Sequence, residues 1–426
     1  MNAPTPLAMS LEAELLAMGR DARTAADALR RSTPDQRTRA LLAMAREIRA
    51  AREEVLSANA VDLSAARDRL TGPELDRLTL NADRLEGIAA GIEAVAAIKD
   101  PVGEEIAHWT RPNGLDFTRV RTPIGVIAVI YESRPNVTAD AAALTLRSGN
   151  AAILRGGSEC LQTSLALHAA IERALVAEGL PAAAVSMVRT ADRTAVGLML
   201  QGLGGTIDLV IPRGGKSLVA RVREEARVAV LGHLEGLNHV YVHAGADPKI
   251  AREVVVNSKM RRVSVCGAAE TLLIDASVAP SVLPLIADDL DKAGCTLRGD
   301  GRAQALLPHI AAATSEDWTT EYLAPVIAVA VVDGMEAACA HIRAYGSGHT
   351  DCIITDDRNA AQTFAETVDS AIVLINASTQ FADGGEFGFG AEIGIATDRL
   401  HARGPVGAEQ LTTFKYVVRG TGQTRP

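Results

Sequence analysis

The sequence predicts an α/β protein with two parallel sheets, a helical N-terminal region and a separate antiparallel hairpin. From about residue 119 onwards, short and continuously apolar segments alternate with helical segments. Such strands indicate parallel sheets that are buried on both faces. A second block of alternating strands and helices runs from residue 270 to residue 378. The length of 426 residues also exceeds what one hydrophobic core accommodates. We therefore expect two or three domains, two of which are built on a parallel sheet.

The first hundred residues are expected to be helical. Apolar residues recur at steps of four and three over residues 11–29, which places one apolar stripe along a helix. A second helix is predicted to begin at Thr33-Pro34-Asp35-Gln36, a capping-box pattern with proline at the first helical position. We expect this helix to continue through Leu41 and Ile48 to Val55, and we assign the whole region a scaffolding role.

Five strands are predicted for the first sheet. A helix over residues 161–177, closed by Gly179 and Pro181, separates the second strand from the third. Parallel sheets bind ligands at the carboxyl ends of their strands. The predicted strands are residues 124–131, 151–154, 185–188, 207–211 and 239–243.

Two of these strands lead into the same kind of turn before a helix. One turn is Arg155-Gly156-Gly157, and the other is Arg213-Gly214-Gly215-Lys216. The backbone N–H groups and the cation of such a turn can face phosphate. Neither turn matches the G-x-G-x-x-G or P-loop pattern, and a plain structural turn is the alternative explanation for each. Because the turn is repeated, we favour the binding of a phosphate-bearing cofactor.

The second block is predicted to form another α/β domain. A glycine-rich stretch at residues 381–390 follows it and is expected to form a shaped loop. A polar hairpin at 105–121 and a strand at 410–418 lie outside both sheets, and we expect them to form sheet edges of a homo-oligomer. The predicted strands of the second block are residues 270–275, 326–332, 352–355 and 371–376.

Composition argues against several classes of protein. A formal net charge of −9 argues against binding of nucleic acid. No uncharged stretch reaches the length of a membrane helix, and the first residues show no targeting signal. Five cysteines without paired spacing indicate a reducing compartment. We expect a cytoplasmic protein that binds neither nucleic acid nor a membrane.

Cys266 is the candidate nucleophile. It follows the cations Lys259, Arg261 and Arg262 and precedes an apolar strand. Nearby cations favour the thiolate form and help to receive an anionic substrate. Since most unpaired cysteines are small buried hydrophobes, a structural role stays open from these residues alone. The position of Cys266 near the junction of the two expected domains favours catalysis, because ligands bind preferentially at such junctions.

Ten segments, spread over nearly the whole chain, carry a family resemblance. They are residues 130–138 (IYESRPNVT), 153–157, 211–216, 265–266, 270–273, 321–325 (EYLAP), 345–351 (YGSGHTD), 376–379, 381–390 and 401–405 (HARGP). Through them the chain resembles the glutamate-5-semialdehyde dehydrogenase family of the aldehyde dehydrogenase superfamily. The resemblance implies an aldehyde-dehydrogenase-like fold with two Rossmann-like parallel-sheet domains and a small oligomerisation hairpin.

The resemblance also implies a reaction. This is the NADPH-dependent reduction of L-glutamate 5-phosphate to L-glutamate 5-semialdehyde, with release of phosphate, on the route to proline. Cys266 is then expected to attack the acyl phosphate carbonyl and to form a thioester that NADPH reduces. We expect a separate glutamate kinase to supply the acyl phosphate and to associate transiently with this chain.

The resemblance assigns roles to four further residues. Asn136 is expected to donate to the oxyanion together with the backbone N–H of Cys266, with a turn role as the alternative. Arg134 is the alternative donor to the oxyanion, or it binds the phosphate or the carboxylate of the substrate. Glu321 resembles the glutamate that binds the nicotinamide ribose, with helix capping as the alternative. Arg155 is expected near the adenosine ribose, where it would accept the 2′-phosphate of NADPH.

The chain departs from the family pattern at three positions. Where oxidising members of the superfamily have a hydrolytic glutamate, in the segment that aligns with residues 231–242, this chain has His233. A reductase needs no hydrolytic base, so His233 favours acyl-phosphate chemistry over an oxidative aldehyde dehydrogenase, which is the alternative function. Gly267 stands in place of an asparagine and Asn238 in place of a cysteine. A nucleotide-binding module without activity is a third hypothesis, which Cys266-dependent turnover would exclude.

No metal site is predicted. Cys339, His341, His349 and Cys352 could be drawn as a zinc set, but their spacing matches no tetrahedral signature. The segment that contains His401 and Arg403 could contact the substrate or a neighbouring subunit. The expected domains are residues 1–104 with 122–245 for NADPH binding, 246–385 for catalysis, and 105–121 with 400–420 for oligomerisation.

Overall fold

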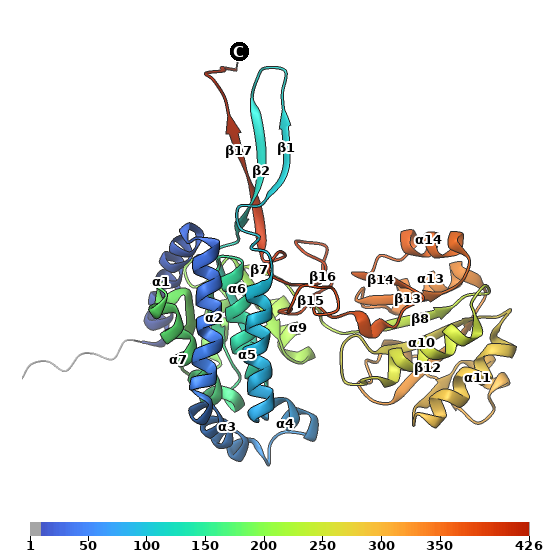
Figure 1. Cartoon of the computed structure of the whole chain (residues 1–426). Helices are drawn as coiled ribbons and strands as arrows, with labels where there is room; N and C mark the ends of the chain where they lie inside the picture. The colour runs from blue at the N-terminus through green and yellow to red at the C-terminus, as the bar shows by residue number, and fades with distance from the viewer. Residues whose placement is uncertain (1–9, 426) are drawn as a thin grey trace, which may run out of the picture. The chain divides into compact units, whose positions relative to one another are not determined.

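The computed structural model describes residues 10–425, which form two compact units (Figure 1). The first unit comprises the described chain up to Gly232, the segment Gly388–Gly394 and the residues from Val406 onwards. The second unit comprises His233–Phe387 and Ile395–Pro405. None of the helices within residues 10–425 combines the length and the apolar character that crossing a bilayer requires.

Helices make up the N-terminal part of the first unit, as the apolar spacing predicts. Helix α2 begins after Thr33, whose hydroxyl accepts a hydrogen bond from the Gln36 N–H at 3.1 Å. The helix ends at Ala50 instead of continuing to Val55, because Ala51 leaves helical geometry with a ψ of 11° before α3 starts. The helices are α1 (Leu11–Arg31), α2 (Pro34–Ala50), α3 (Arg52–Ala66), α4 (Gly72–Leu78) and α5 (Ala82–Ala97).

The first unit contains a five-stranded parallel sheet in the order β5-β4-β3-β6-β7. The chain runs from the central β3 outward through β4 to β5 and then returns to β6 on the other side of β3. The carboxyl ends of β4 and β6 therefore flank the end of β3, where open sheets of this kind bind ligands. The strands are β3 (Val126–Tyr131), β4 (Ala151–Arg155), β5 (Val185–Met187), β6 (Leu209–Arg213) and β7 (Ala229–Val230). The helices between them are α6 (Asn136–Arg147), α7 (Leu161–Ala177), α8 (Thr194–Leu200) and α9 (Lys216–Glu225).

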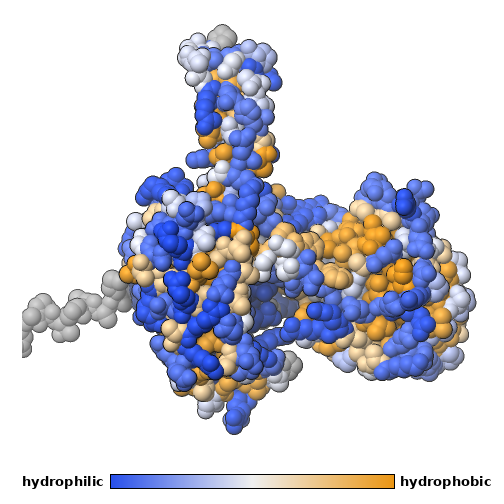
Figure 2. Space-filling view, viewed as in Figure 1, coloured by the Kyte–Doolittle hydropathy of each residue, from blue (hydrophilic) through white to orange (hydrophobic). Residues whose placement is uncertain are grey.

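A three-stranded antiparallel sheet confirms the predicted hairpin and terminal strand. The order is β1-β2-β17, with β1 (Glu105–Thr110), β2 (Asp116–Pro123) and β17 (Thr412–Arg419). Phe414 and Tyr416 are 47% and 53% exposed, and they share one face because they are two residues apart on a strand. Apolar surface is visible on this sheet in Figure 2.

The second unit contains a seven-stranded parallel sheet in the order β11-β10-β12-β9-β8-β13-β14. Its strands are β8 (Asn238–Val242), β9 (Ala269–Asp275), β10 (Thr296–Gly299), β11 (Ala311–Ala312), β12 (Val326–Val332), β13 (Thr350–Ile354) and β14 (Ile372–Ile375). Its helices are α10 (Pro248–Met260), α11 (Ala279–Lys292), α12 (Gly301–Leu306), α13 (Gly334–Tyr345) and α14 (Arg358–Thr367). A short antiparallel pair, β15 (Ile395–Ala396) with β16 (Gly404–Pro405), completes the unit.

The strand expected at residues 239–243 exists, but its assignment to the first sheet is wrong. This strand, β8, pairs with β9 and β13 in the second unit, with Val240 opposite both Leu272 and Cys352. An apolar strand pattern predicts burial on both faces, but it does not specify which partner strand supplies the hydrogen bonds. The two units divide the chain before β8, whereas the domains expected from the sequence divide after residue 245.

Candidate active site

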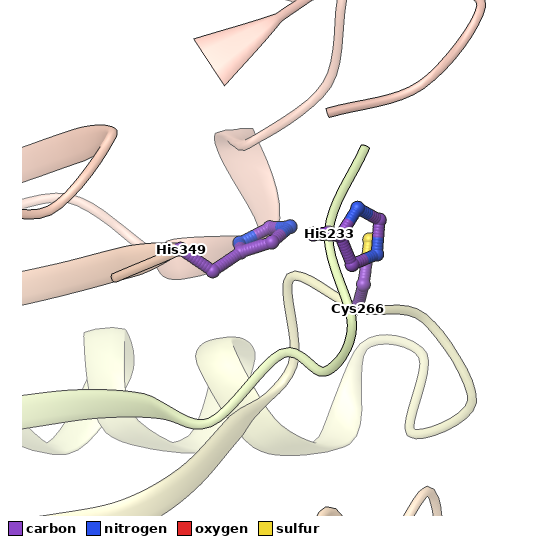
Figure 3. Close-up of side chains that lie close together, drawn as sticks. All are labelled: His233, Cys266 and His349. Carbon is purple, nitrogen blue, oxygen red and sulfur yellow. The ribbon is translucent and has the colours of Figure 1, made fainter. Parts of the chain in front are cut away.

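The candidate site lies at the amino-terminal edge of the sheet in the second unit. Four neighbouring strands, in the order β12-β9-β8-β13, are each preceded by a loop that carries a notable residue. Glu321 precedes β12, Cys266 precedes β9, His233 precedes β8 and His349 precedes β13. Because parallel strands start at the same edge, their preceding loops converge there. Figure 3 shows the result for Cys266, His233 and His349, whose side chains lie together.

The carboxamide of Asn238 holds the turn that carries Cys266. Its Nδ2 donates to the carbonyl oxygen of Cys266 at 2.6 Å and to that of Ala268 at 2.8 Å. Its Oδ1 accepts a hydrogen bond from the Thr350 N–H at 3.1 Å. Asn238 is the first residue of β8 and is fully buried. One side chain therefore connects the nucleophile turn before β9 to the start of β13.

Gly236 lies directly against the same turn. A Cβ atom at this position would be 2.1 Å from the Cys266 carbonyl oxygen, which is far inside van der Waals contact. Its N–H donates to Oε1 of Glu321 at 2.9 Å, and the next N–H, of Leu237, donates to Oγ of Ser347 at 3.0 Å. The loop before β8 thus requires glycine where it passes Cys266. Glu321 lies in a loop and accepts a hydrogen bond from this backbone, so it does not cap a helix.

The two histidines beside Cys266 have their Nδ1 atoms engaged. The Nδ1–H of His233 donates to the carbonyl oxygen of Ile395 at 2.8 Å, and Nδ1 of His349 lies 2.9 Å from Oγ1 of Thr350. The imidazole rings meet edge to face with centroids 4.9 Å apart. Burial, and secondarily the neighbouring His233, holds the pKa of His349 well below the usual histidine range. His349 is therefore a neutral imidazole at pH 7.

The three cations before Cys266 lie in two different surroundings. Lys259 is fully buried on α10, and its Nζ donates to Oε2 of Glu270 at 2.6 Å. Burial raises the pKa of Glu270 to about 7, against the opposing effect of the Lys259 charge. Arg261 and Arg262 are exposed. Lys259 is thus paired with the Glu270 carboxyl group, and its expected role at the thiol stays a prediction.

In the first unit, a carboxylate lies against each Arg-Gly-Gly turn. Oε2 of Glu132 accepts a hydrogen bond from the Gly215 N–H at 3.0 Å and occupies the space that a Cβ at Gly214 would need. Similarly, the Glu159 carboxylate lies 2.0 Å from where a Cβ at Gly157 would be. At both turns the glycines let an anionic group approach the main chain closely, as phosphate binding also requires.

Arg155 and Arg213 lie at the strand ends that carry these turns. Arg155 is buried, its Nη2 donates to the Ala191 carbonyl oxygen at 3.1 Å, and its Nε has no hydrogen-bond partner. The Nε of Arg213 is likewise buried without a partner. Lys216 is exposed and begins α9. Buried N–H groups without an acceptor are rare and fit a site that receives an anionic ligand.

Asn136 begins α6, also in the first unit. Its Nδ2 donates to Oδ2 of Asp140, one helical turn along, at 2.9 Å. Desolvation raises the pKa of Asp140 to about 6. Arg134 is half-buried and precedes the helix. The role of Asn136 or Arg134 at the oxyanion stays a prediction.

Of the four residues considered as a zinc set from the sequence, His349 lies beside Cys266. Cys352 and Cys339 belong to two separate apolar core clusters of the second unit, on opposite sides of its sheet. His349, Asn238 and Gly236 were not assigned to the site from the sequence. The shared signal is their position immediately before, or at the start of, strands that neighbour β9, which only the strand order reveals.

Comparisons with known proteins agree with this architecture. A model of the aldehyde dehydrogenase family matches residues 7–297. The gamma-glutamyl phosphate reductase of Caulobacter sp. (strain K31) is 70% identical over 98% of this chain and 100% of its own, and that of Hyphomonas neptunium is 61% identical over 99% of both. The crystal structure of gamma-glutamyl phosphate reductase from Thermotoga maritima matches with a TM-score of 0.95 at 43% identity, covering 97% of this chain and 100% of that one. The predicted fold class is confirmed.

Replacing Gly236 by alanine tests the packing at the nucleophile turn. We expect Gly236→Ala to lower the free energy of unfolding by about 1–3 kcal/mol, because the added methyl must displace the Cys266 carbonyl. Urea unfolding followed by circular dichroism measures the effect. Gly301→Ala is the matched control, since a Cβ there meets nothing within 4 Å. Equal effects of the two substitutions would contradict the packing argument.

Proposed function

Because the chain belongs to the aldehyde dehydrogenase family, we propose that it catalyses the reduction of L-glutamate 5-phosphate to L-glutamate 5-semialdehyde, with release of phosphate, in proline biosynthesis. The observation that carries this proposal is the full-length similarity, at 70% identity, to a gamma-glutamyl phosphate reductase. The thiol of Cys266, at the edge where four loops converge, supplies the nucleophile that the reaction needs.

Cys266 carries the first step of the proposed reaction. Its thiolate sulfur attacks the acyl phosphate carbonyl, a C–S bond forms, and the C–O bond to the departing phosphate breaks. The product is a γ-glutamyl thioester on Cys266 and inorganic phosphate. Asn238 and Gly236 fix the main chain of Cys266, so that its N–H can face the developing oxyanion.

Asn136 is the proposed second donor to the oxyanion. A carboxamide nitrogen carries two hydrogens, and Asp140 accepts one of them. The second hydrogen is therefore the one assigned to the oxyanion. One well-aimed donor of this kind contributes about 2.7–4 kcal/mol of transition-state stabilisation. We assign Arg134 to the anionic groups of the substrate, which a guanidinium binds with two parallel hydrogen bonds.

The aldehyde dehydrogenase family uses nicotinamide cofactors, and the residues of the first unit fit one. When bound, the reduced nicotinamide supplies the hydride that converts the thioester to the semialdehyde. The two turns at residues 155–157 and 213–216 would hold its phosphates. Two observations support this: the Glu132 and Glu159 carboxylates lie against the main chain of the turns, and each turn has a buried guanidinium N–H without an acceptor. We propose that Arg155 selects NADPH by binding the 2′-phosphate and that Glu321 accepts the ribose hydroxyls.

The residue beside the thiol favours reduction over oxidation. In the loop that precedes β8, His233 is the side chain that lies beside Cys266, at the place where oxidising members have a glutamate (Figure 3). A carboxylate there would activate water against the thioester. This chain has an imidazole there, held by the Ile395 carbonyl, in place of that carboxylate.

The remaining partners follow from the substrate and from the exposed sheet. Because an acyl phosphate is labile, we propose that a glutamate kinase delivers it in the cytoplasm by transient association, which co-sedimentation of the two proteins would detect. We also propose a homo-oligomer that covers the exposed face of β17. Exposed aromatic residues at a sheet edge are typical of such interfaces.

The nucleophile is tested by replacing Cys266 with serine. In the reverse direction, with semialdehyde, NADP⁺ and phosphate, we expect Cys266→Ser to lower turnover by about a thousandfold or more, the scale of losing a catalytic nucleophile. The buried Cys295, replaced by alanine, is the control that should retain activity. Full phosphate-dependent activity of Cys266→Ser would overturn the proposed mechanism.

Arg155→Leu tests the proposed preference for NADPH. A hydrogen bond to a charged group contributes about 1.5–3 kcal/mol, so we expect KM for NADPH to rise about 10- to 100-fold while KM for NADH changes little. Steady-state kinetics with both cofactors measures the split. Arg189→Ala, at an exposed position in the same unit, is the control. An equal rise in KM for NADPH and for NADH would show that Arg155 does not bind the 2′-phosphate.

Charge on the exposed face of β17 tests the oligomer. We expect the double substitution Phe414→Glu with Tyr416→Glu to reduce the sedimentation coefficient to that of a monomer, because both side chains lie on that face. Lys415→Glu reverses the charge of the exposed residue between them, on the opposite face, and should leave the assembly intact. An unchanged assembly in the double variant would place the interface elsewhere.

A further inference from the structure

Cys266, His233 and His349 offer three metal-binding atoms in one place. One atom of each side chain lies within 4.8 Å of both others. The three residues come from the loops before β9, β8 and β13, which are adjacent in the sheet. No spacing signature predicts this set, because its members are brought together by strand order and not by a shared sequence motif.

The hydrogen bonds of the two imidazoles prepare them for a ligand on the other nitrogen. His233 is held through Nδ1 by the Ile395 carbonyl, and His349 is held through Nδ1 by the Thr350 hydroxyl. Metal-binding histidines almost always use their second nitrogen in this way, which fixes the ring orientation. In Figure 3 the ring of His349 points toward Cys266 and His233.

Nε2 of His349 supplies an independent observation. This atom is buried and has no hydrogen-bond partner, and the His349 side chain is fully buried. A buried nitrogen without a partner normally has one in the functional state, such as a water molecule or an ion. Nδ1 is the nitrogen that contacts Thr350, and in Figure 3 the end of the ring points toward His233 and Cys266.

We propose that Cys266, His233 and His349 form a binding site for one soft divalent cation, with Zn²⁺ as the best match. A thiolate and two imidazoles prefer Zn²⁺ to Mg²⁺ or Ca²⁺. Zn–S and Zn–N bonds of about 2.3 and 2.0–2.1 Å place tetrahedral ligand atoms roughly 3.3–3.6 Å apart. Side-chain rotations that bring the donors closer by up to about 1.5 Å achieve this geometry, and the fourth position stays open to water.

Binding of the cation would inhibit the enzyme reversibly, a consequence that rests on the proposed function. The thiol loses its proton to solvent, a Zn–S bond forms, and the sulfur electron pair that would attack the acyl phosphate is committed to the metal. Removal of Zn²⁺ by a chelator restores the thiol without any change in oxidation state. The site is therefore a point at which zinc availability would control the reaction.

Titration of the full-length chain with Co²⁺ tests the site without reference to activity. We expect one Co²⁺ per chain, with a thiolate-to-cobalt charge-transfer band that is lost in Cys266→Ser. We expect His349→Gln and His233→Gln each to weaken binding at least about tenfold, since each removes one of three ligands. The controls are Cys339→Ser and His309→Gln, which lie outside the set and should bind Co²⁺ as the natural chain does.

Inhibition by Zn²⁺ separates this proposal from the proposed function. Reductase activity should fall as Zn²⁺ fills the site and return when EDTA is added. A charge-transfer band that survives in Cys266→Ser, or equal affinity in His349→Gln and the natural chain, would overturn the metal site. Thermal melting of each variant shows whether it is folded, and His233→Gln provides a second test if His349→Gln is not. Metal binding as expected in a chain without reductase activity would overturn the proposed function and leave the metal site standing.

Discussion

The parallel alignment of β12, β9, β8 and β13 is the constraint on which the candidate site depends. The four strands begin at the same edge of the sheet, so the loops that precede them lie together at that edge. Within that edge, the Asn238 carboxamide binds the carbonyl oxygens of Cys266 and Ala268 and the N–H of Thr350 at the start of β13. Gly236 then lets the neighbouring loop pass against the Cys266 carbonyl. Both interactions hold the main chain that carries the thiol.

This arrangement changes the account of how the thiol is used. Lys259, the first of the three cations that precede Cys266, belongs to a buried ion pair with Glu270, which joins α10 to β9. The polar groups that do lie beside Cys266 are the imidazoles of His233 and His349. A neutral, buried His349 can take part in hydrogen bonding or metal binding without adding charge. The thiol therefore has two imidazole nitrogens beside it, while the charge of Lys259 is paired with Glu270.

Much of the fold is predictable from the sequence, because local patterns specify local structure. The helix at residues 161–177, which ends before Gly179 with its φ of 71°, and the strand at residues 326–332, a continuous apolar run, are found as predicted. The sheet to which β8 belongs was not predictable, because hydrogen bonding to strands distant in the sequence determines it. The same limit applies to the site. Cys266 has a local signal, whereas His349 becomes a neighbour of the thiol only through the order β9-β8-β13.

The central claim is that Cys266 carries the γ-glutamyl group as a thioester between the two chemical steps. Incubation with semialdehyde and NADP⁺ in the absence of phosphate should accumulate this acyl-enzyme, because phosphate is the group that resolves it in the reverse direction. Peptide mapping by mass spectrometry would then find one γ-glutamyl group on the peptide that contains Cys266, and addition of phosphate would remove it. Reduction of NADP⁺ with Cys266 unmodified, or with the acyl group on another residue, would contradict the account.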